Sequence, residues 1–295
     1  MSTERLYRTE GIIMRRREQG EADRVLTLCT PLGKIEVIVK GARKLRSRKA
    51  GHIELFTRSS FVISRVPNSW DIVSQAETIE PHKLLRGDLL RGTYARYAVE
   101  LLDRFFAQGE GGPALFDLLD RTLTWLCEDD DLDLILRFYE QHLLGLAGFR
   151  PELFRCVGEH KEYVPLRPRE PTENGRPYGF DPEQGGALCR SCYVTHGERR
   201  EVISLSPDVL WFLQECQQGP YARLHTQHIA PALHEEAERV MQHYITYHLE
   251  RGVRSGTFLR RLRWEQVHKA GTGCMSSNIS LVTSTNTCDV KIILK

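Results

Sequence analysis

The chain has 295 residues, of which 41% are hydrophobic and 27% are charged, which indicates a globular protein with enough apolar residues for a core. Its formal net charge of +2 conceals an asymmetry, because residues 1–50 hold thirteen Lys/Arg and only six Asp/Glu. No run approaches the roughly 20 apolar residues needed to span a bilayer. The arginine-rich start also lacks a signal-peptide pattern. We therefore expect a cytoplasmic protein without membrane contact, and a local cationic face for an anionic partner.

Residues 5–80 alternate between apolar and polar side chains, as β-strands do, and turn signals separate the segments, so a strand domain is expected over 1–80. The expected strands contain residues 12–14, 25–28, 35–39, 61–66 and 72–79. Five short strands without a helical period between them favour a small closed barrel. An oligonucleotide-binding (OB) fold is the natural candidate, and an SH3-like barrel fits the same pattern.

A strongly cationic stretch, KGARKLRSRK, runs from Lys40 to Lys49 directly after the third expected strand. Six of its ten residues are cationic and none is acidic, so it would attract a polyanion, of which nucleic acid is the commonest. A solvated loop is the plainer interpretation of the same residues. We predict that these cations and those of the neighbouring strands form a groove for DNA phosphates. The predicted DNA-binding residues are Arg15, Arg24, Lys34, Lys40, Arg43, Lys44, Arg46, Arg48 and Lys49.

Aromatic side chains in the same region are candidate platforms for base stacking, since single strands are held by phosphate contacts together with stacking. Phe56, Phe61 and Trp70 are available, although a place in the barrel core explains each of them better. Nothing in the pattern indicates contacts to base edges, so we expect binding without sequence specificity. A single strand of nucleic acid is therefore the partner that these residues favour.

After Pro81 the apolar residues recur at three- and four-residue steps, which is typical of amphipathic helices. Helices are expected over 89–105, from Pro113, and over 131–147, and together they predict a helical domain at 81–150. Their apolar stripes are interpreted as packing surface, although an exposed remnant has the chemistry to hold a partner's peptide.

The helical pattern returns at Ser206 and again over 231–250, so the helical domain is expected to continue through 201–262. Residues 263–295 are predicted to be a disordered tail, because the sequence from Ala270 is rich in Ser, Thr and Asn. The histidines of this region are interpreted as surface or packing residues.

Residues 151–200 are rich in Pro and Gly, and we expect little regular structure there. Cys156 lies at one end and a CxxC motif, Cys189 to Cys192, at the other. Without a core of its own, such a segment often depends on a metal ion for order. We predict a structural Zn²⁺ site with Cys156, His160, Cys189 and Cys192 as ligands, and a set with Glu159 in place of His160 is the alternative. A redox CxxC is disfavoured because no βαβ pattern surrounds it.

An enzymatic alternative rests on the order of His160, Glu162, Cys189 and Cys192, which is similar to the H-x-E…C-x-x-C pattern of zinc-dependent nucleobase deaminases. In such an enzyme Glu162 would act as the general acid and base. That pattern requires Pro directly before the first Cys of the pair, where this chain has Leu188. No P-loop motif is present either. We therefore expect a protein that is not an enzyme.

An ordered set of short motifs resembles the RecO family of bacterial recombination mediators. The matching motifs, which span roughly residues 5–262, are Thr9–Ile13, Gly20–Arg24, Thr30–Lys34, Lys40–Lys44, Gln75–Glu77, Leu146–Pro151 and Leu188–Cys192, with an ending at Tyr247–Leu249 and Phe258–Leu259. The resemblance implies an α+β multidomain fold: an N-terminal OB barrel, then a helical domain with an inserted zinc-finger-like segment.

The same resemblance implies a function. Members of the family bind single- and double-stranded DNA, anneal complementary strands and help to load RecA onto DNA coated by single-strand binding protein (SSB). The implied partners are RecR and the acidic C-terminal tail of SSB. By matching position, the family's OB-domain cations correspond to Lys34, Lys40, Arg43 and Lys44, and its zinc cysteines to Cys156, Cys189 and Cys192. Many members have a further cysteine where this chain has Glu159.

Overall fold

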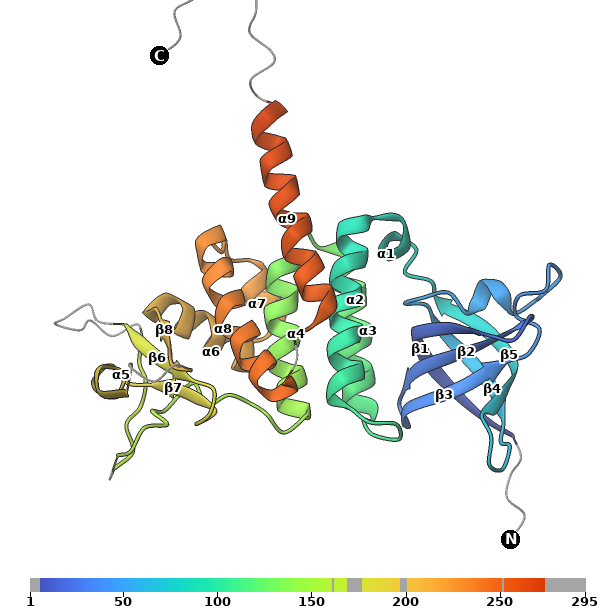
Figure 1. The fold of residues 1–295 in the computed structure, drawn as a ribbon, viewed down its shortest axis with the longest axis horizontal. Coiled ribbons are helices and arrows are strands. Elements are labelled where there is room, and N and C mark those ends of the chain that lie inside the picture. The colour runs from blue at the N-terminus through green and yellow to red at the C-terminus, as the bar shows by residue number, and fades with distance from the viewer. Residues whose placement is uncertain (1–5, 161, 169–176, 197–200, 251, 274–295) are drawn as a thin grey trace, which may run out of the picture.

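The computed structural model describes residues 6–160, 162–168, 177–196, 201–250 and 252–273. Figure 1 shows a β-barrel at one end, a bundle of helices in the middle and a small sheet at the other end. The α+β multidomain architecture expected from the sequence is therefore confirmed. No helix within the described ranges is both long and apolar enough to cross a bilayer.

The barrel is a single closed sheet with the strand order β1-β2-β3-β5-β4. Its strands are β1 (Leu6–Gln19), β2 (Asp23–Thr30), β3 (Gly33–Val39), β4 (Arg58–Ser64) and β5 (Asp71–Glu80). All pairs are antiparallel except β3 with β5, where Ile38 lies beside Ile72. This order, with one parallel closure, is that of an OB fold, which selects between the two barrel types left open by the sequence. A 3₁₀ turn, η1 (Ala50–His52), lies between β3 and β4.

Strand β1 supplies side chains to two cores because successive residues of a strand point to opposite faces. Ile13 belongs to the apolar interior of the barrel, whereas Ile12 and Met14 belong to the core that continues into the helical domain. A shift of register lies between Ile13 and Arg15 in the pairing with β2. Burial of both faces at this point attaches the barrel to the helices.

The central bundle contains α1 (Leu84–Gly87), α2 (Leu89–Phe105), α3 (Pro113–Glu128), α4 (Leu132–Leu146), α6 (Pro207–Gln218), α7 (Tyr221–His225), α8 (Pro231–Leu249) and α9 (Arg254–Gly273). Side-chain caps begin three of them. The Asp88, Asp131 and Ser206 side chains accept hydrogen bonds from the third backbone N–H of the following helix. Pro at the first helical position begins α3, α6 and α8. The helices expected from apolar periodicity therefore occur where the sequence placed them.

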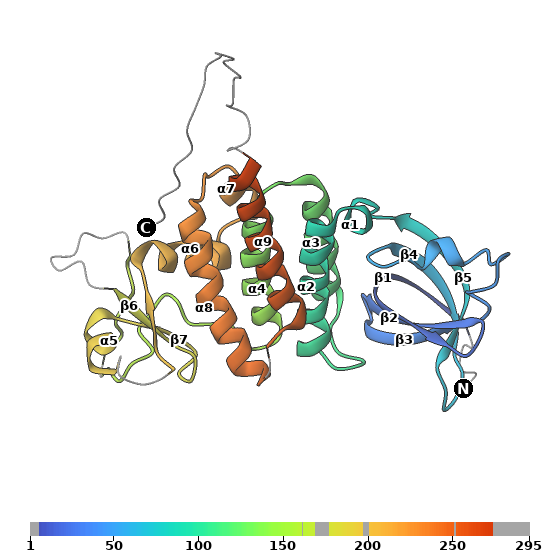
Figure 2. The ribbon, with the colours of Figure 1, turned by 45° about the horizontal axis from the view of Figure 1, so that its top comes forward.

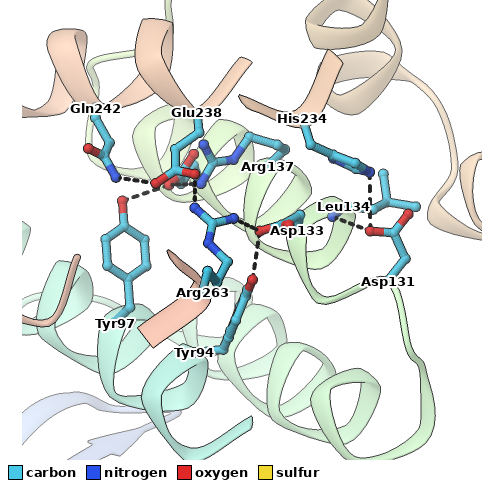
Figure 3. Close-up of polar contacts among 11 residues, drawn as sticks. Tyr94, Tyr97, Asp131, Asp133, Leu134, Arg137, His234, Glu238, Gln242 and Arg263 are labelled. Atoms are coloured by element: carbon cyan, nitrogen blue, oxygen red, sulfur yellow. Dashed lines mark hydrogen bonds and ion pairs between the residues drawn. The ribbon is translucent and has the colours of Figure 1, made fainter. Parts of the chain in front are cut away.

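Helix α9 departs from the prediction of a tail over 263–295, because the helix continues to Gly273 (Figures 1 and 2). Arg263, the first residue of the predicted tail, forms ion pairs with Asp133 of α4 and Glu238 of α8. Figure 3 shows its guanidinium between these carboxylates, with Tyr94 of α2 donating to Asp133 at 2.7 Å. These contacts between distant helices were not visible as a sequence pattern. The part of the predicted tail at 274–295 lies outside the described residues.

The cysteine segment, residues 151–205, has more regular structure than its Pro/Gly content suggested. Three short strands, β6 (Tyr178–Asp181), β7 (Gly186–Leu188) and β8 (Ile203–Leu205), form an antiparallel sheet, and α5 (Arg190–His196) follows β7. Glycine permits this sheet where a side chain would collide: a Cβ at Gly186 would lie 2.4 Å from the Glu152 carbonyl oxygen. Strand β8 lies within 201–262, where the sequence predicted helices alone, and it pairs with β6.

Candidate nucleic-acid interface and metal centre

The outer face of the barrel carries a cleft of about 320 Å³, which we call the barrel cleft. It is lined by residues of the β1–β2 turn, of β3 and β5, and of the β4–β5 loop: Gly20, Asp23, Ile38, Lys40, Trp70 and Ile72 among them. OB folds bind oligonucleotides on the face of strands 2 and 3, between the loops joining strands 1–2 and 4–5. The barrel cleft therefore lies where this fold class holds nucleic acid.

The Lys40–Lys49 stretch, which we call the basic loop, begins at this cleft and projects from the barrel on the side away from the helices (Figure 1). Its base is ordered by the Asp23 carboxylate, which accepts hydrogen bonds at 2.8 Å from Lys40 Nζ and from the Gly41 N–H. These two donors hold the pKa of Asp23 below its usual value. Gly41 has a φ of +66°, a conformation that favours glycine. The sequence between β3 and η1 thus turns sharply and then exposes its cations.

Most loop cations are exposed and weakly held. Arg43 pairs with Glu18 at 3.2 Å, while Lys44, Arg46 and Arg48 are exposed, and Arg46 and Arg48 have no ion-pair partner among the described residues. Lys49 is half-buried and donates a hydrogen bond from Nζ to the Val73 carbonyl at 3.0 Å. This bond attaches the end of the basic loop to strand β5. Surface ion pairs contribute little free energy, so a phosphate can displace them.

The strand cations are divided between two places. Arg24 lies 4.0 Å from Glu54, on the barrel wall. Lys34 and Arg15 instead face Asp103 of α2, at the junction with the helical domain. Lys34 is 9% exposed, and its ammonium donates to Asp103 Oδ1 at 2.8 Å and to the carbonyls of Asp103 and Phe106. All three of its donors are used, which leaves none for a phosphate.

The three aromatic candidates for base stacking also differ in their exposure to solvent. Phe56 and Phe61 are buried in the two cores, which agrees with the plainer interpretation of these residues. Trp70 is half-buried in the wall of the barrel cleft, and the guanidinium of Arg17 lies 4.9 Å from its ring centroid. Trp70 thus keeps part of its ring available at the surface.

The cysteine segment brings together four potential metal ligands, Cys156, His160, Cys189 and Cys192, whose ligand atoms all lie within 4.8 Å of one another. His160 Nε2 lies 3.2 Å from Cys156 Sγ, 3.4 Å from Cys189 Sγ and 3.1 Å from Cys192 Sγ. Cys156 and Cys189 are 33 residues apart in the sequence, and the β6–β7 hairpin lies between them. Cys189 directly precedes α5, and Cys192 lies within that helix. Glu159 is exposed and is not a member of this group, so the geometry selects His160 over Glu159.

The electrostatics of this cluster suit a cation. Burial opposes ionisation of Cys189, but hydrogen bonds from Ser191, the Cys192 N–H and His160 lower its thiol pKa to about 6. Burial and the neighbouring sulfur atoms raise the pKa of Cys192 to about 12, and burial raises that of Cys156. One thiolate therefore forms readily, whereas further thiolates need a cation to offset their mutual repulsion.

Three sulfur ligands and one imidazole match the ligand set of structural zinc sites. These four residues would hold Zn²⁺, whose contribution would be to cross-link the ends of the cysteine segment. A set of four protein ligands fills a tetrahedral site and leaves no position for the water that a hydrolytic site requires. Glu162, the general acid and base of the deaminase alternative, is exposed and lies outside the cluster.

Sequence reasoning did not place an apolar groove of about 980 Å³ between α3, α4 and α7. Trp125 lines it and is stacked on Tyr221 at 3.9 Å between ring centroids, with Phe138 packed edge-on against it. Arg121 and Arg150 line it and are exposed. One sequence signal could have indicated this groove. Trp125 follows Arg121 by four residues, so the two side chains share one face of the same helix.

An OB barrel joined to a helical domain, with a cluster of three cysteines and one histidine, defines a multidomain protein of the OB-fold class. Family comparison narrows this class. The model described as Recombination protein O N terminal matches residues 1–82, and the one described as Recombination protein O C terminal matches residues 86–257. The chain therefore belongs to the RecO family of DNA repair and recombination proteins.

Individual relatives agree with this assignment. The DNA repair protein RecO of Roseiflexus sp. (strain RS-1) is 38% identical over 260 residues, which are 88% of this chain and 87% of the relative. Those of Desulforudis audaxviator and Symbiobacterium thermophilum are 37% and 35% identical, over 87% and 88% of this chain and 97% and 98% of theirs. The matches extend over both domains, so the resemblance seen in short motifs is confirmed.

Proposed function

We propose that this chain is a non-enzymatic recombination mediator. It binds single- and double-stranded DNA through the barrel, anneals complementary strands, and helps to load RecA onto SSB-coated DNA. Membership of the RecO family supports the repair role. The observation that carries the DNA-binding part is the position of the basic loop beside the cleft that OB folds use for nucleic acid.

Strand annealing follows from the charge of this face. Each phosphate that is neutralised by Lys or Arg releases condensed counterions, which favours binding at low salt. Five cations are exposed on one loop, namely Lys40, Arg43, Lys44, Arg46 and Arg48. In the proposed mechanism they contact two strands at once. Two strands held there repel each other less, and complementary bases meet at a higher local concentration.

The groove between α3, α4 and α7 is the proposed site for the acidic C-terminal tail of SSB. Exposed Arg121 and Arg150 would pair with the carboxylates of the tail, while an apolar side chain would pack on Trp125. A labelled peptide with the sequence of that tail is expected to bind the wild type. The double variant Arg121→Glu, Arg150→Glu is expected to lose the peptide but to keep binding DNA. Equal peptide affinity for both proteins would exclude this groove.

RecR and, indirectly, RecA are the further partners of the proposed mediator, which would act on the chromosome in the cytoplasm, at the nucleoid. The competing enzymatic proposal assigns a reaction to Glu162. A closed set of four protein ligands disfavours it. The Glu162→Gln variant is expected to anneal strands as well as the wild type, whereas loss of function with the fold intact would favour the enzyme.

Fluorescence anisotropy with a labelled single strand, measured across a salt series, tests the proposed function. We expect a linear fall of log affinity with log salt. The double variant Lys40→Glu, Arg43→Glu should bind more weakly, with a slope smaller by about 2, since each phosphate contact contributes about 1. The matched control is Lys83→Glu, Arg96→Glu, which changes the same charge at exposed sites of the helical domain. Equal affinity and slope for both double variants would overturn the proposal.

A further inference from the structure

We propose that the barrel cleft receives one unstacked nucleobase against the ring of Trp70, and that this contact makes the barrel prefer single-stranded to double-stranded DNA. The inference rests on the proposed function, because it requires that DNA binds at this face. It goes beyond that function by assigning a base subsite to a particular residue. Phosphate contacts to the basic loop are common to both forms of DNA and do not explain a preference between them.

The ring of Trp70 is positioned for stacking. Trp70 ends the β4–β5 loop and lies over the outer barrel wall, where Ile38 and Ile72, neighbours in the β3–β5 pair, also line the cleft. Arg17 lies over the indole at 4.9 Å from the ring centroid and does not line the cleft. Trp70 lines the cleft and is only half-buried, so the part of the indole that faces the cleft is available to a base. Aromatic rings on basic grooves hold bases of any type in this way.

The cleft is large enough for a base. Its volume of about 320 Å³ is at the lower end of the range for ligand clefts. In a duplex every base is stacked and paired, so entry into the cleft would require the extrusion of a nucleotide at a cost of a few kcal/mol. A single strand has bases that are already accessible. The cleft is therefore available to single strands without this cost.

The charges around the cleft are consistent with a neutral base inside and phosphates outside. Asp23 is the acid in the cleft, and its carboxylate is offset by Lys40 Nζ and the Gly41 N–H, each at 2.8 Å. Lys40 lines the cleft and also begins the basic loop. A strand whose base lies on Trp70 would therefore have its phosphates directed towards Lys40 and the loop.

The test uses three substitutions in the full chain: Trp70→Ala, Trp70→Leu and Trp70→Phe. We expect Ala and Leu to weaken binding of a mixed-sequence single strand by about tenfold or more, and Phe to retain most of the affinity, since stacking needs an aromatic ring. Duplex affinity should be unchanged in all three. An abasic single strand with the same number of phosphates should bind the wild type and Trp70→Ala equally.

The outcomes separate three explanations. If the Ala and Leu variants bind normal, abasic and duplex DNA with equal losses, Trp70 only supports the loop and the inference is overturned. If they bind all three as the wild type does, while Lys40→Glu, Arg43→Glu weakens binding, the base subsite is wrong and the proposed function stands. If none of these variants changes binding, the proposed function itself fails. Thermal unfolding of each variant identifies any loss that arises from misfolding, and Trp70→Phe keeps the test decisive in that case.

Discussion

The barrel and the cysteine segment are both made of short strands, yet they are stabilised in different ways. The barrel closes on itself, with strands of 7 to 14 residues and an apolar interior of its own. The cysteine segment has strands of only three or four residues, and its buried side chains belong to the core of the helices. Phe180 of β6, for example, packs edge-on against Tyr244 of α8.

This difference shows where each region can tolerate change. A closed sheet has no edges and needs no external cross-link, so the surface of the barrel is available for charge and binding. A three-stranded sheet of this size is marginal by itself, so we expect it to depend on packing against the helices and on the four-ligand cluster. The barrel is therefore expected to lose function before structure, and the cysteine segment to lose structure first.

The largest expected effect is on the cysteine segment. The double variant Cys189→Ser, Cys192→Ser removes two of the four ligands, and a strong chelator removes any metal from the wild type. Because metal binding and folding of such a segment are coupled, we expect backbone amides of 177–196 to lose protection in hydrogen exchange, while those of the barrel keep theirs. Cys127→Ser, a half-buried thiol outside the cluster, is the control. Unchanged protection at 177–196 would mean that helix packing suffices.

The next effect is at the junction between the barrel and the helices. Lys34→Met leaves the Asp103 carboxylate and two backbone carbonyls without their partner, which should cost about 3 kcal/mol of unfolding free energy. The exposed control, Lys44→Met, should stay within about 0.5 kcal/mol. Denaturant unfolding measures both. Similar midpoints for the two variants would contradict the structural role of Lys34.

A smaller effect separates charge from stability within the barrel. Replacing Lys44, Arg46 and Arg48 by Gln should leave the unfolding midpoint unchanged, since these side chains are exposed. The salt slope of DNA binding should fall by up to about 3, and annealing of complementary strands should become slower. A lower midpoint with an unchanged slope would mean that these cations stabilise the barrel and do not contact DNA.

The smallest effect concerns Asp23, which holds Lys40 and, in the proposed function, would compete with phosphate for it. Asp23→Asn should tighten DNA binding by a few-fold, because the Asn oxygen still accepts from the Gly41 N–H but carries no charge. The hydrogen bond from Lys40 keeps the pKa of Asp23 below its usual value. The Asp23 side chain is therefore negatively charged at every pH above the ordinary pKa of an aspartate. It becomes neutral only when the pH falls below that value. The variant and the wild type should therefore differ by a constant factor from about pH 5 to pH 8. A difference that disappears at pH 5 would contradict this assignment.

The sequence determined much of this protein because its signals are local. Alternation over 5–80 defined the barrel strands, and apolar steps of three and four residues defined the helices, since burial of one face imposes these periods. The residue types Cys156, His160, Cys189 and Cys192 identified the cluster for the same reason: few side chains bind a soft metal ion. The motifs that resembled RecO were equally local in the chain.

Tertiary structure decided the properties that depend on distant partners. Lys34 and Lys40 are both lysines at the ends of strand β3, so the sequence predicted the same role for both. In the structure Asp103 of α2 pairs with Lys34, whereas Lys40 lines the barrel cleft. His160 and Glu159 both offered a ligand, and the fold of the segment placed only the imidazole among the sulfur atoms. Helix α9 continues past Arg263, and this residue forms ion pairs with Asp133 of α4 and Glu238 of α8. Local periodicity carries no information about such pairs, since their energies arise when remote segments of the chain meet.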